Sequence, residues 1–308
     1  MDFVIFTVAM TALIYGADFV IKESERIALQ FDISHYVIGA TLIAFGTSLP
    51  EMAASMMASY AGKSEMAIAN VVGSVIFNIT LVLGIVFFIS KKMVPKRDLF
   101  SLDSAWVVIP VVLFFIMIQD GEISRTDGVL YLLLMISYLI FLFGSAKETL
   151  ESDIDEELLK EKFNWGLTIA LLLVGFALTI GGANFVVESG TNIARNFGVS
   201  EWIIGLFLIA FGTSLPELVV SVVAIKKGNA EMSIGNIIGS NVANFSMVLG
   251  SASLLSPLSI DLIATKFDLF IMAAASITLV FILANRLYNK AGAIFLLIIL
   301  ALFIQNAV

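Results

Sequence analysis

The sequence predicts an all-α integral membrane protein with ten transmembrane helices, arranged as two inverted five-helix repeats. Composition is the first observation. The 308 residues are 59% hydrophobic and 14% charged, with a mean hydropathy of +1.02, whereas a soluble domain carries about a quarter charged residues. The second is a series of apolar runs near the length of about 20 residues that a helix needs to cross a bilayer. The third is an internal repeat: residues 16–84 align without a gap with residues 182–250 and are identical at 33 of 69 positions.

Each apolar run predicts a helix, because lipid admits only helices and closed barrels, and these runs are too long for barrel strands. We expect the helices at residues 3–22, 36–60, 65–89, 103–119, 127–145, 165–187, 202–225, 231–254, 267–285 and 291–306. The first and the sixth continue beyond their apolar parts into the amphipathic segments 22–31 and 188–197. An odd number of helices in each half means that the second half enters the membrane from the opposite side, which gives inverted repeats.

The basic residues predict the orientation in a cell membrane that the chain crosses many times. By alternate connections, 13 of the Lys and Arg residues fall on one side and 4 on the other, and the richer side is cytoplasmic. Both termini are then extracellular. The first repeat spans residues 1–145, an acidic cytoplasmic linker spans 146–163, and the second repeat spans 164–308. The linker lacks the spacing and the glycine of an EF-hand, so we interpret it as a solvated connection.

One octapeptide occurs twice, at Ala44–Glu51 and, letter for letter, at Ala210–Glu217. Each copy ends on an acid inside an apolar run, where acids are costly and usually functional. The proline before each acid has no N–H, so carbonyls in the preceding turn lose a helical partner and are available to a dehydrated cation. Glu51 and Glu217 have no Lys or Arg close by in the predicted spans, so protons or bound cations must compensate their charge.

Further polar side chains recur at intervals of four residues, which places them on one face of each helix. In the first half they are Thr47, Ser55, Asn70, Ser74 and Asn78, and in the second half Thr213, Ser221, Asn236, Ser240 and Asn244. For Asn70 and Asn236, a structural role that orients the ligands is as good an interpretation as direct binding. Small residues on the same helices, Gly235 and Gly239 among them, allow the helix backbones to approach closely.

The predicted ligands are all oxygen atoms, from carboxylates, amides, hydroxyls and backbone carbonyls. Ca²⁺ accepts such ligands in a flexible geometry, whereas Mg²⁺ gives up its water reluctantly, and transition metals recruit His or Cys. The chain has no cysteine and one histidine, His35, which we interpret as an interfacial residue. Two carboxylates would neutralise one Ca²⁺ or hold several Na⁺ at the same place. These ions are transported, and no cofactor is expected.

Several other functions do not fit the residues. A nucleic-acid partner is excluded because there is no basic face and no aromatic–basic motif. Ser48 near Glu51 lacks the His or Lys support of a hydrolase, so we do not expect an enzyme. A cation channel remains an alternative, although a channel does not need two pseudo-symmetric gates. Asp103, Asp120 and Asp127 fall near predicted helix ends, which predicts interfacial positions for them.

The chain resembles the cation/Ca²⁺ exchanger superfamily, and in particular its prokaryotic sodium/calcium exchanger branch. The resemblance rests on the motifs at Gly46–Glu51, Gly73–Asn78, Gly212–Glu217 and Gly239–Asn244, and with the five-plus-five plan it covers essentially the whole chain. It implies a Na⁺/Ca²⁺ antiporter whose two glutamates bind the ions at mid-membrane. By position, the implied ligands are Ala44, Thr47, Ser48, Glu51, Ser74 and Asn78 in the first half and Ala210, Thr213, Ser214, Glu217, Ser240 and Asn244 in the second.

The resemblance also implies the moving parts, because in this family the first and sixth helices slide across the other eight. Segments 3–31 and 165–197 would then be the gates, in a protein that we expect to work as a monomer. One position departs from the pattern: many relatives carry Asp where this chain has Asn244, so Asn78 and Asn244 are both amides. A Ca²⁺/H⁺ exchanger therefore stays as the alternative function, although that branch usually shows Gly-Asn-Ala in place of Gly-Thr-Ser before the acid.

Overall fold

The computed structural model describes residues 1–90, 95–144, 163–198 and 211–307. Within these ranges, seven helices are long and apolar enough to cross a membrane, and a bent pair of shorter helices raises the number to as many as eight. The prediction of an all-helical membrane protein is confirmed. The predicted linker, apart from its last residue, and the first part of the predicted helix 202–225 lie outside the described residues.

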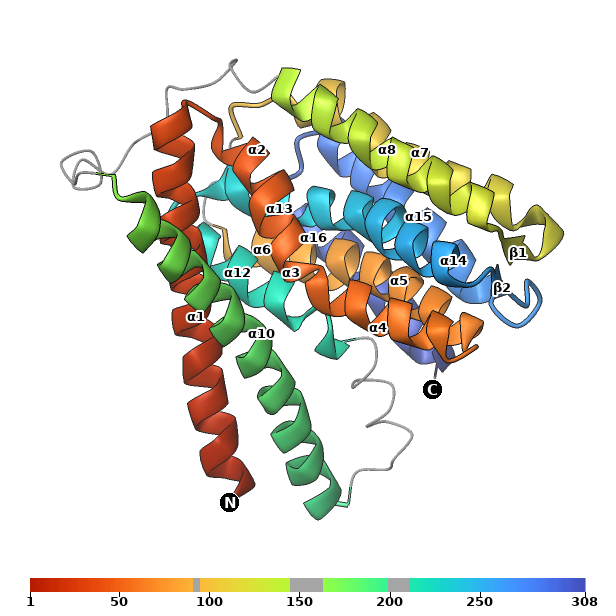
Figure 1. The fold of residues 1–308 in the computed structure, drawn as a ribbon, viewed down its shortest axis with the longest axis horizontal. Coiled ribbons are helices and arrows are strands. Elements are labelled where there is room, and N and C mark those ends of the chain that lie inside the picture. The colour runs from red at the N-terminus through yellow and green to blue at the C-terminus, as the bar shows by residue number, and fades with distance from the viewer. Residues whose placement is uncertain (91–94, 145–162, 199–210, 308) are drawn as a thin grey trace.

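The elements follow the predicted order (Figure 1). The first half contains α1 (Asp2–Phe31), α2 (His35–Ile38), the π-helical η1 (Gly39–Ile43), α3 (Ala44–Thr47), α4 (Leu49–Tyr60), α5 (Ser64–Phe77), the π-helical η2 (Asn78–Val82), α6 (Leu83–Ile89), α7 (Leu99–Met117), the 3₁₀-helical η3 (Ile118–Asp120), β1 (Glu122–Ile123) and α8 (Arg125–Gly144). The second contains α10 (Trp165–Asn196), α12 (Leu215–Lys226), α13 (Ala230–Ala243), the π-helical η4 (Asn244–Leu249), α14 (Gly250–Leu255), β2 (Leu258–Ser259), α15 (Lys266–Ala284) and α16 (Lys290–Ala307). As predicted, α1 and α10 run on beyond their apolar parts.

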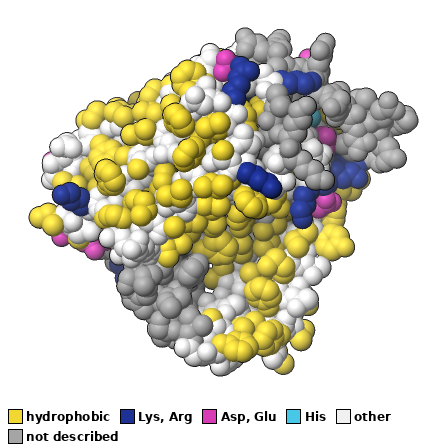
Figure 2. All heavy atoms as spheres, turned by 180° about the vertical axis from the view of Figure 1, so that it is seen from behind, with side chains coloured by type: hydrophobic (Ala, Val, Ile, Leu, Met, Phe, Trp, Pro, Cys, Tyr) yellow, Lys and Arg dark blue, Asp and Glu magenta, His cyan; other side chains and the backbone are white. Residues whose placement is uncertain are grey.

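The outer surface of the bundle is apolar, as lipid contact requires. Large hydrophobic side chains face outward on several helices, for example Ile140 on α8 and Phe270 and Ile277 on α15, each about two-thirds exposed. Figure 2 shows a broad apolar area on one face of the molecule, with the charged side chains mostly toward its margins. We infer that this surface contacts the acyl chains.

Helices α1 and α10 lie side by side at one edge of the molecule (Figure 1). Their backbones nearly touch at glycines: a methyl group added at Gly182 would lie 2.7 Å from the backbone nitrogen of Leu13. Helix α1 also packs along α12. There, Nζ of Lys227 stands 2.6 Å from Oδ1 of Asp18. Small residues therefore join the two long helices to each other, and an ion pair joins α1 to the rest of the bundle.

Helix α13 makes an equally close contact with the beginning of the second predicted span. A methyl group at Gly235 would meet the carbonyl oxygen of Tyr36, and one at Gly239 would meet that of Ala40. The predicted close approach at these two glycines is thus confirmed. It brings a polar helix of the second half directly against the first half.

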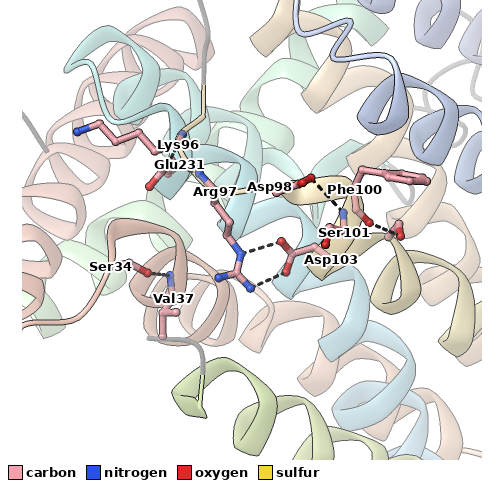
Figure 3. Close-up of polar contacts among 10 residues, drawn as sticks. Ser34, Val37, Lys96, Arg97, Asp98, Phe100, Ser101, Asp103 and Glu231 are labelled. Carbon is pink, nitrogen blue, oxygen red and sulfur yellow. Dashed lines mark hydrogen bonds and ion pairs between the residues drawn. The ribbon is translucent and has the colours of Figure 1, made fainter. Parts of the chain in front are cut away.

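A buried ion pair holds the start of α7 beside α2 and α13 (Figure 3). Arg97 donates from Nε to Oδ2 of Asp103 at 2.7 Å and from Nη2 to Oδ1 at 3.1 Å. Its guanidinium stands 4.5 Å from the ring centroid of Tyr36, and Glu231 of α13 accepts the backbone N–H of Arg97 at 3.1 Å. Asp103 does lie near a helix end, but it is fully buried rather than facing the interface. The sequence analysis did not predict the burial of Asp103, because its partner Arg97 lies outside the predicted helix 103–119.

The two short strands were not predicted. They pair antiparallel, with Ile123 opposite Leu258, and join the connection after η3 to the one after α14. Strands of two residues are too short to carry an alternating pattern, so the sequence holds no signal for them.

Candidate ion-binding site

The two glutamates of the repeated octapeptide are completely buried. Each lies in the first turn of a helix, Glu51 in α4 and Glu217 in α12, directly after a break in the backbone. The break falls at Ser48, with φ −85° and ψ 3°, and at its counterpart Ser214, with φ −87° and ψ 3°. The proline that follows fits the start of the new helix, where no N–H partner is needed. The predicted interruption is confirmed, and in the first half it bends the span by 44°.

The break of each half contacts the polar helix of the other half. Thr47 Oγ1 lies 3.3 Å from Oδ1 of Asn236, and Thr213 Oγ1 lies 3.5 Å from Oδ1 of Asn70. The two contacts are related by the repeat: Thr213 lies 166 residues after Thr47, and Asn236 lies 166 residues after Asn70. Ser74 Oγ also lies 3.4 Å from Thr213 Oγ1. Thr47, Thr213 and Ser74 of the predicted site are therefore joined across the two halves through these contacts.

Asn70 and Asn236 are held by hydrogen bonds at both ends of their amides. Asn70 Nδ2 donates to Ser55 Oγ at 2.9 Å and to the carbonyl oxygen of Glu51 at 3.2 Å. Asn236 Nδ2 donates in the same way to Ser221 Oγ at 3.1 Å. Each amide oxygen then takes a threonine hydroxyl, as described above. This favours the orienting role for the two asparagines, because little of either amide is left for an ion.

The carboxylates of the two glutamates, unlike these amides, have few hydrogen bonds within the part of the protein that the structure describes. In the described part of the chain, both carboxylate oxygens of Glu51 and one of Glu217 have no hydrogen-bond partner. The same holds for the buried oxygen atoms of Asn78 (Oδ1), Asn244 (Oδ1), Ser214 (Oγ) and Ser240 (Oγ). Ser48 Oγ donates weakly to the other oxygen of Glu217, at 3.4 Å. Buried polar atoms normally find partners, so this set of oxygens is suited to ligate a cation.

The carbonyl of Ala44 is less free than the proline argument predicts. It accepts the backbone N–H of Ser48 at 3.0 Å, and Thr47 Oγ1 lies 3.3 Å away. The Thr47 hydroxyl has one proton and also lies 3.1 Å from the carbonyl oxygen of Ile43 and 3.3 Å from Oδ1 of Asn236. When that proton goes to either of them, a lone pair of the Ala44 carbonyl is open to a ligand. Its counterpart Ala210 lies outside the described residues.

Two features of the site were missed from the sequence. Asn78 and Asn244 each begin a π-helical segment, η2 and η4, and such segments often mark functional sites. Asn241 Oδ1 accepts a hydrogen bond from Asn78 Nδ2 at 3.2 Å. It was overlooked because its repeat counterpart is Val75, so it stands out from no symmetric pair.

A cavity of about 460 Å³ leads toward the site from one side. Polar residues of α10, including Asn184, Glu188 and Asn192, line it, and it reaches Gly212 and Thr213 just before α12. Gly46, the repeat counterpart of Gly212, lies directly against the ring of Phe176 of α10.

The oxygen atoms of the site are suited to hard cations, and only two of the side chains that supply them are carboxylates. Among the described residues, no group of three or more His, Asp or Glu side chains could hold a metal ion. Beyond its two carboxylates, the site offers neutral hydroxyl, amide and carbonyl oxygens, which suit Ca²⁺ and Na⁺.

Comparison with known proteins agrees with this chemistry. A family model described as "Sodium/calcium exchanger protein" matches residues 1–144 and 167–307. An uncharacterized membrane protein of Methanocaldococcus jannaschii is 36% identical, over 97% of this chain and 94% of that protein. The sodium/calcium exchanger MaX1 of Methanosarcina acetivorans is 30% identical, over 92% and 91%.

Solved structures of the sodium–calcium exchanger NCX_Mj share the fold. One of them, soaked with Na⁺ and Sr²⁺, superimposes with a TM-score of 0.84 at 32% sequence identity, over 99% of this chain and 98% of that one. The family model, the nearly full-length matches and the shared fold all indicate the same family. The chain belongs to the sodium/calcium exchanger family of multi-pass membrane transporters and is not an enzyme.

Proposed function

We propose that the protein is an electrogenic Na⁺/Ca²⁺ antiporter that carries both ions through one buried site by alternating access. The observation that carries this proposal is the pair of buried carboxylates, Glu51 and Glu217, surrounded by oxygen atoms without partners in the described chain. Two buried negative charges need compensation. Bound cations supply it, and a cation that leaves must be replaced.

Competition at the carboxylates explains the exchange. One Ca²⁺ matches the two negative charges, whereas Na⁺ must bind in several copies to do the same. Both ions accept the same hydroxyl, amide and carbonyl oxygens. The threonine hydroxyls suit either ion: each can donate its one proton to a protein acceptor, the amide oxygen of Asn236 for Thr47 and that of Asn70 for Thr213, and its lone pairs then remain for the cation.

The arrangement of two inverted five-helix repeats, 1–145 and 164–308, accounts for access from both sides. The repeat-related contacts Thr47–Asn236 and Thr213–Asn70 support it. In this scheme α1 and α10 move together as the gates, and the cavity along α10 is the open, extracellular access path. The excess of Lys and Arg in alternate connections supports extracellular termini and a cytoplasmic linker at 146–163.

Ca²⁺/H⁺ exchange is the second candidate, and one observation favours it. Asn244 provides an amide where the resemblance to the family leads us to expect a carboxylate, so the negative charge available to Na⁺ is smaller. Protons, unlike Na⁺, need only the two glutamates. The name of the relative MaX1 supports sodium, and we place Na⁺/Ca²⁺ exchange first.

Replacing either glutamate tests the site. Glu51→Gln and Glu217→Gln keep the size of the side chain and remove its charge, so each should abolish Ca²⁺ uptake into Na⁺-loaded proteoliposomes while the purified protein keeps its melting temperature. The exposed Glu65 on α5 offers a matched control, and Glu65→Gln should transport normally. Ca²⁺ uptake that survives in either buried variant would refute the proposed site.

A further inference from the structure

The two asparagines that begin the π-helical segments have different surroundings. Asn78 and Asn244 are both buried, with exposures of 0% and 1%. Asn78 donates from Nδ2 to Oδ1 of Asn241 at 3.2 Å, and its own Oδ1 has no partner in the described chain. For Asn244, neither side-chain atom has a partner there. The site is therefore asymmetric at the position where the repeat is identical.

The asymmetry has a simple origin in the sequence. Asn241 occupies the position that Val75 occupies in the first half. Both are nearly or fully buried, with exposures of 6% and 1%. Only Asn241 can accept a hydrogen bond, so only Asn78 has a neighbour that takes its amide hydrogens.

The direction of an amide decides whether it attracts or repels a cation. Its oxygen is a ligand, whereas its NH₂ group carries partial positive charge and only donates. An amide that is free to turn must be oriented when the ion arrives, which reduces affinity. An amide whose NH₂ is already bound to a neighbour presents its oxygen in advance.

We propose that Asn241 is a positioning residue for ion binding: it holds the NH₂ group of Asn78 so that Asn78 Oδ1 faces the cation. Asn241 acts through Asn78 and does not itself touch the ion. The first half contributes a fixed amide oxygen in this way, and the second half, through Asn244, contributes an amide that can turn. This inference rests on the proposed function, because it assigns Asn78 to the transport site.

The test compares variants of Asn241 by the Ca²⁺ concentration that gives half-maximal ⁴⁵Ca²⁺ uptake into Na⁺-loaded proteoliposomes. Asn241→Val reproduces the residue of the other half. It should raise this concentration about fivefold, as expected for the loss of one hydrogen bond, without lowering the maximal rate. Asn241→Asp keeps an acceptor at the same place and should not raise it. Asn241→Leu provides a second apolar variant should the valine variant not fold.

A second background separates positioning from a merely structural role. In Asn78→Asp both oxygens of the side chain are equivalent, so no neighbour is needed to turn an oxygen to the ion. Adding Asn241→Val to Asn78→Asp should therefore change the half-maximal concentration less than about twofold. The inference would be overturned if Asn241→Val raised the half-maximal Ca²⁺ concentration equally in the parent protein and in Asn78→Asp. It would also be overturned if Asn241→Val did not raise this concentration in the parent protein. Glu51→Gln is measured alongside: transport in that variant would refute the site itself, whereas its loss together with an unaffected Asn241→Val would refute only the positioning role.

Discussion

Glu51 stands three residues after Ser48, the spacing of a capping box at a helix N-terminus. The two residues do not form a capping box in the structure. Ser48 makes no side-chain cap hydrogen bond, and its hydroxyl donates instead toward Glu217 in the other half. A carboxylate that a capping box would bind to its own helix is therefore available to a ligand.

The amide at position 244 gives a prediction about pH. Asn244→Asp adds a third carboxylate to the site, and a carboxylate binds protons in competition with cations. We expect Ca²⁺ uptake by this variant to fall more steeply on acidification than uptake by the parent protein, because protonation removes the added charge. Uptake measured in proteoliposomes across a pH series checks this. Identical profiles for the two proteins would place position 244 away from the ions.

Single residues were predictable from the sequence where the repeat made them conspicuous. Glu51, Glu217 and the hydroxyl residues around them occur twice in register, and the structure buries both glutamates and joins the halves through Ser48–Glu217 and Ser74–Thr213. Asn241 and the pairing of Asp103 were not predictable, since one breaks the repeat and the other depends on a residue in a loop. For Asn70 and Asn236, only the contacts could decide between binding and orienting.

At the scale of helices, the proline breaks were predictable and the π-helical segments were not. A proline without an N–H must interrupt the hydrogen-bond ladder, and both copies of the octapeptide contain one. The π-helical segments η2 and η4 have no comparable signature, because the residue types within them are ordinary helix residues. Their position is nevertheless informative, since both start at a predicted ligand, Asn78 or Asn244.

The contact between α1 and α10 can be tested with neighbouring glycines. A methyl group at Gly182 would lie 2.7 Å from the backbone of α1, whereas one at Gly181 would meet nothing within 4 Å. Gly182→Ala should destabilise the protein by about 1–3 kcal/mol through overpacking and reduce transport. Gly181→Ala should leave both unchanged or slightly raise stability, because alanine favours helix. Thermal melting in detergent and ⁴⁵Ca²⁺ uptake give the two readouts. Equal effects would contradict the close contact.

The ion pair between α1 and α12 predicts an effect on access. Its repeat counterparts are Asn184 and Ala61, which carry no charge, so the pair Asp18–Lys227 stabilises only arrangements in which α1 packs on α12. Asp18→Asn should shift the balance away from the described arrangement by up to about fivefold, the range of partly exposed ion pairs.

Cysteine labelling measures this shift, since the chain has no native cysteine. In an Asn192→Cys background, a residue of the cavity along α10, Asp18→Asn should slow the reaction with a maleimide added from outside. Exchanging the charges, with Asp18→Lys and Lys227→Asp together, should restore the parent rate. A faster reaction after Asp18→Asn would contradict the assignment of the open side.

At the scale of the molecule, the order of the helices follows from hydropathy, because lipid leaves the backbone few alternatives to a helix. The unequal state of the two halves does not follow from the sequence. Helix α1 packs along α12, whereas the described α10 has no comparable packing against α4, and a cavity lies beside α10 instead. The two repeats are identical at 33 of 69 aligned positions, and the alignment itself holds no information on how their helices pack against the rest of the bundle.

The identity of the driving ion is the central claim, and one transport measurement tests it directly. Purified protein in proteoliposomes is given external ⁴⁵Ca²⁺ with either an outward Na⁺ gradient or a pH gradient, with Glu51→Gln as the inactive control. We predict that the Na⁺ gradient drives Ca²⁺ uptake, that the pH gradient alone does not, and that the variant takes up Ca²⁺ under neither condition. Uptake driven by the pH gradient alone would contradict the account and assign the site to Ca²⁺/H⁺ exchange.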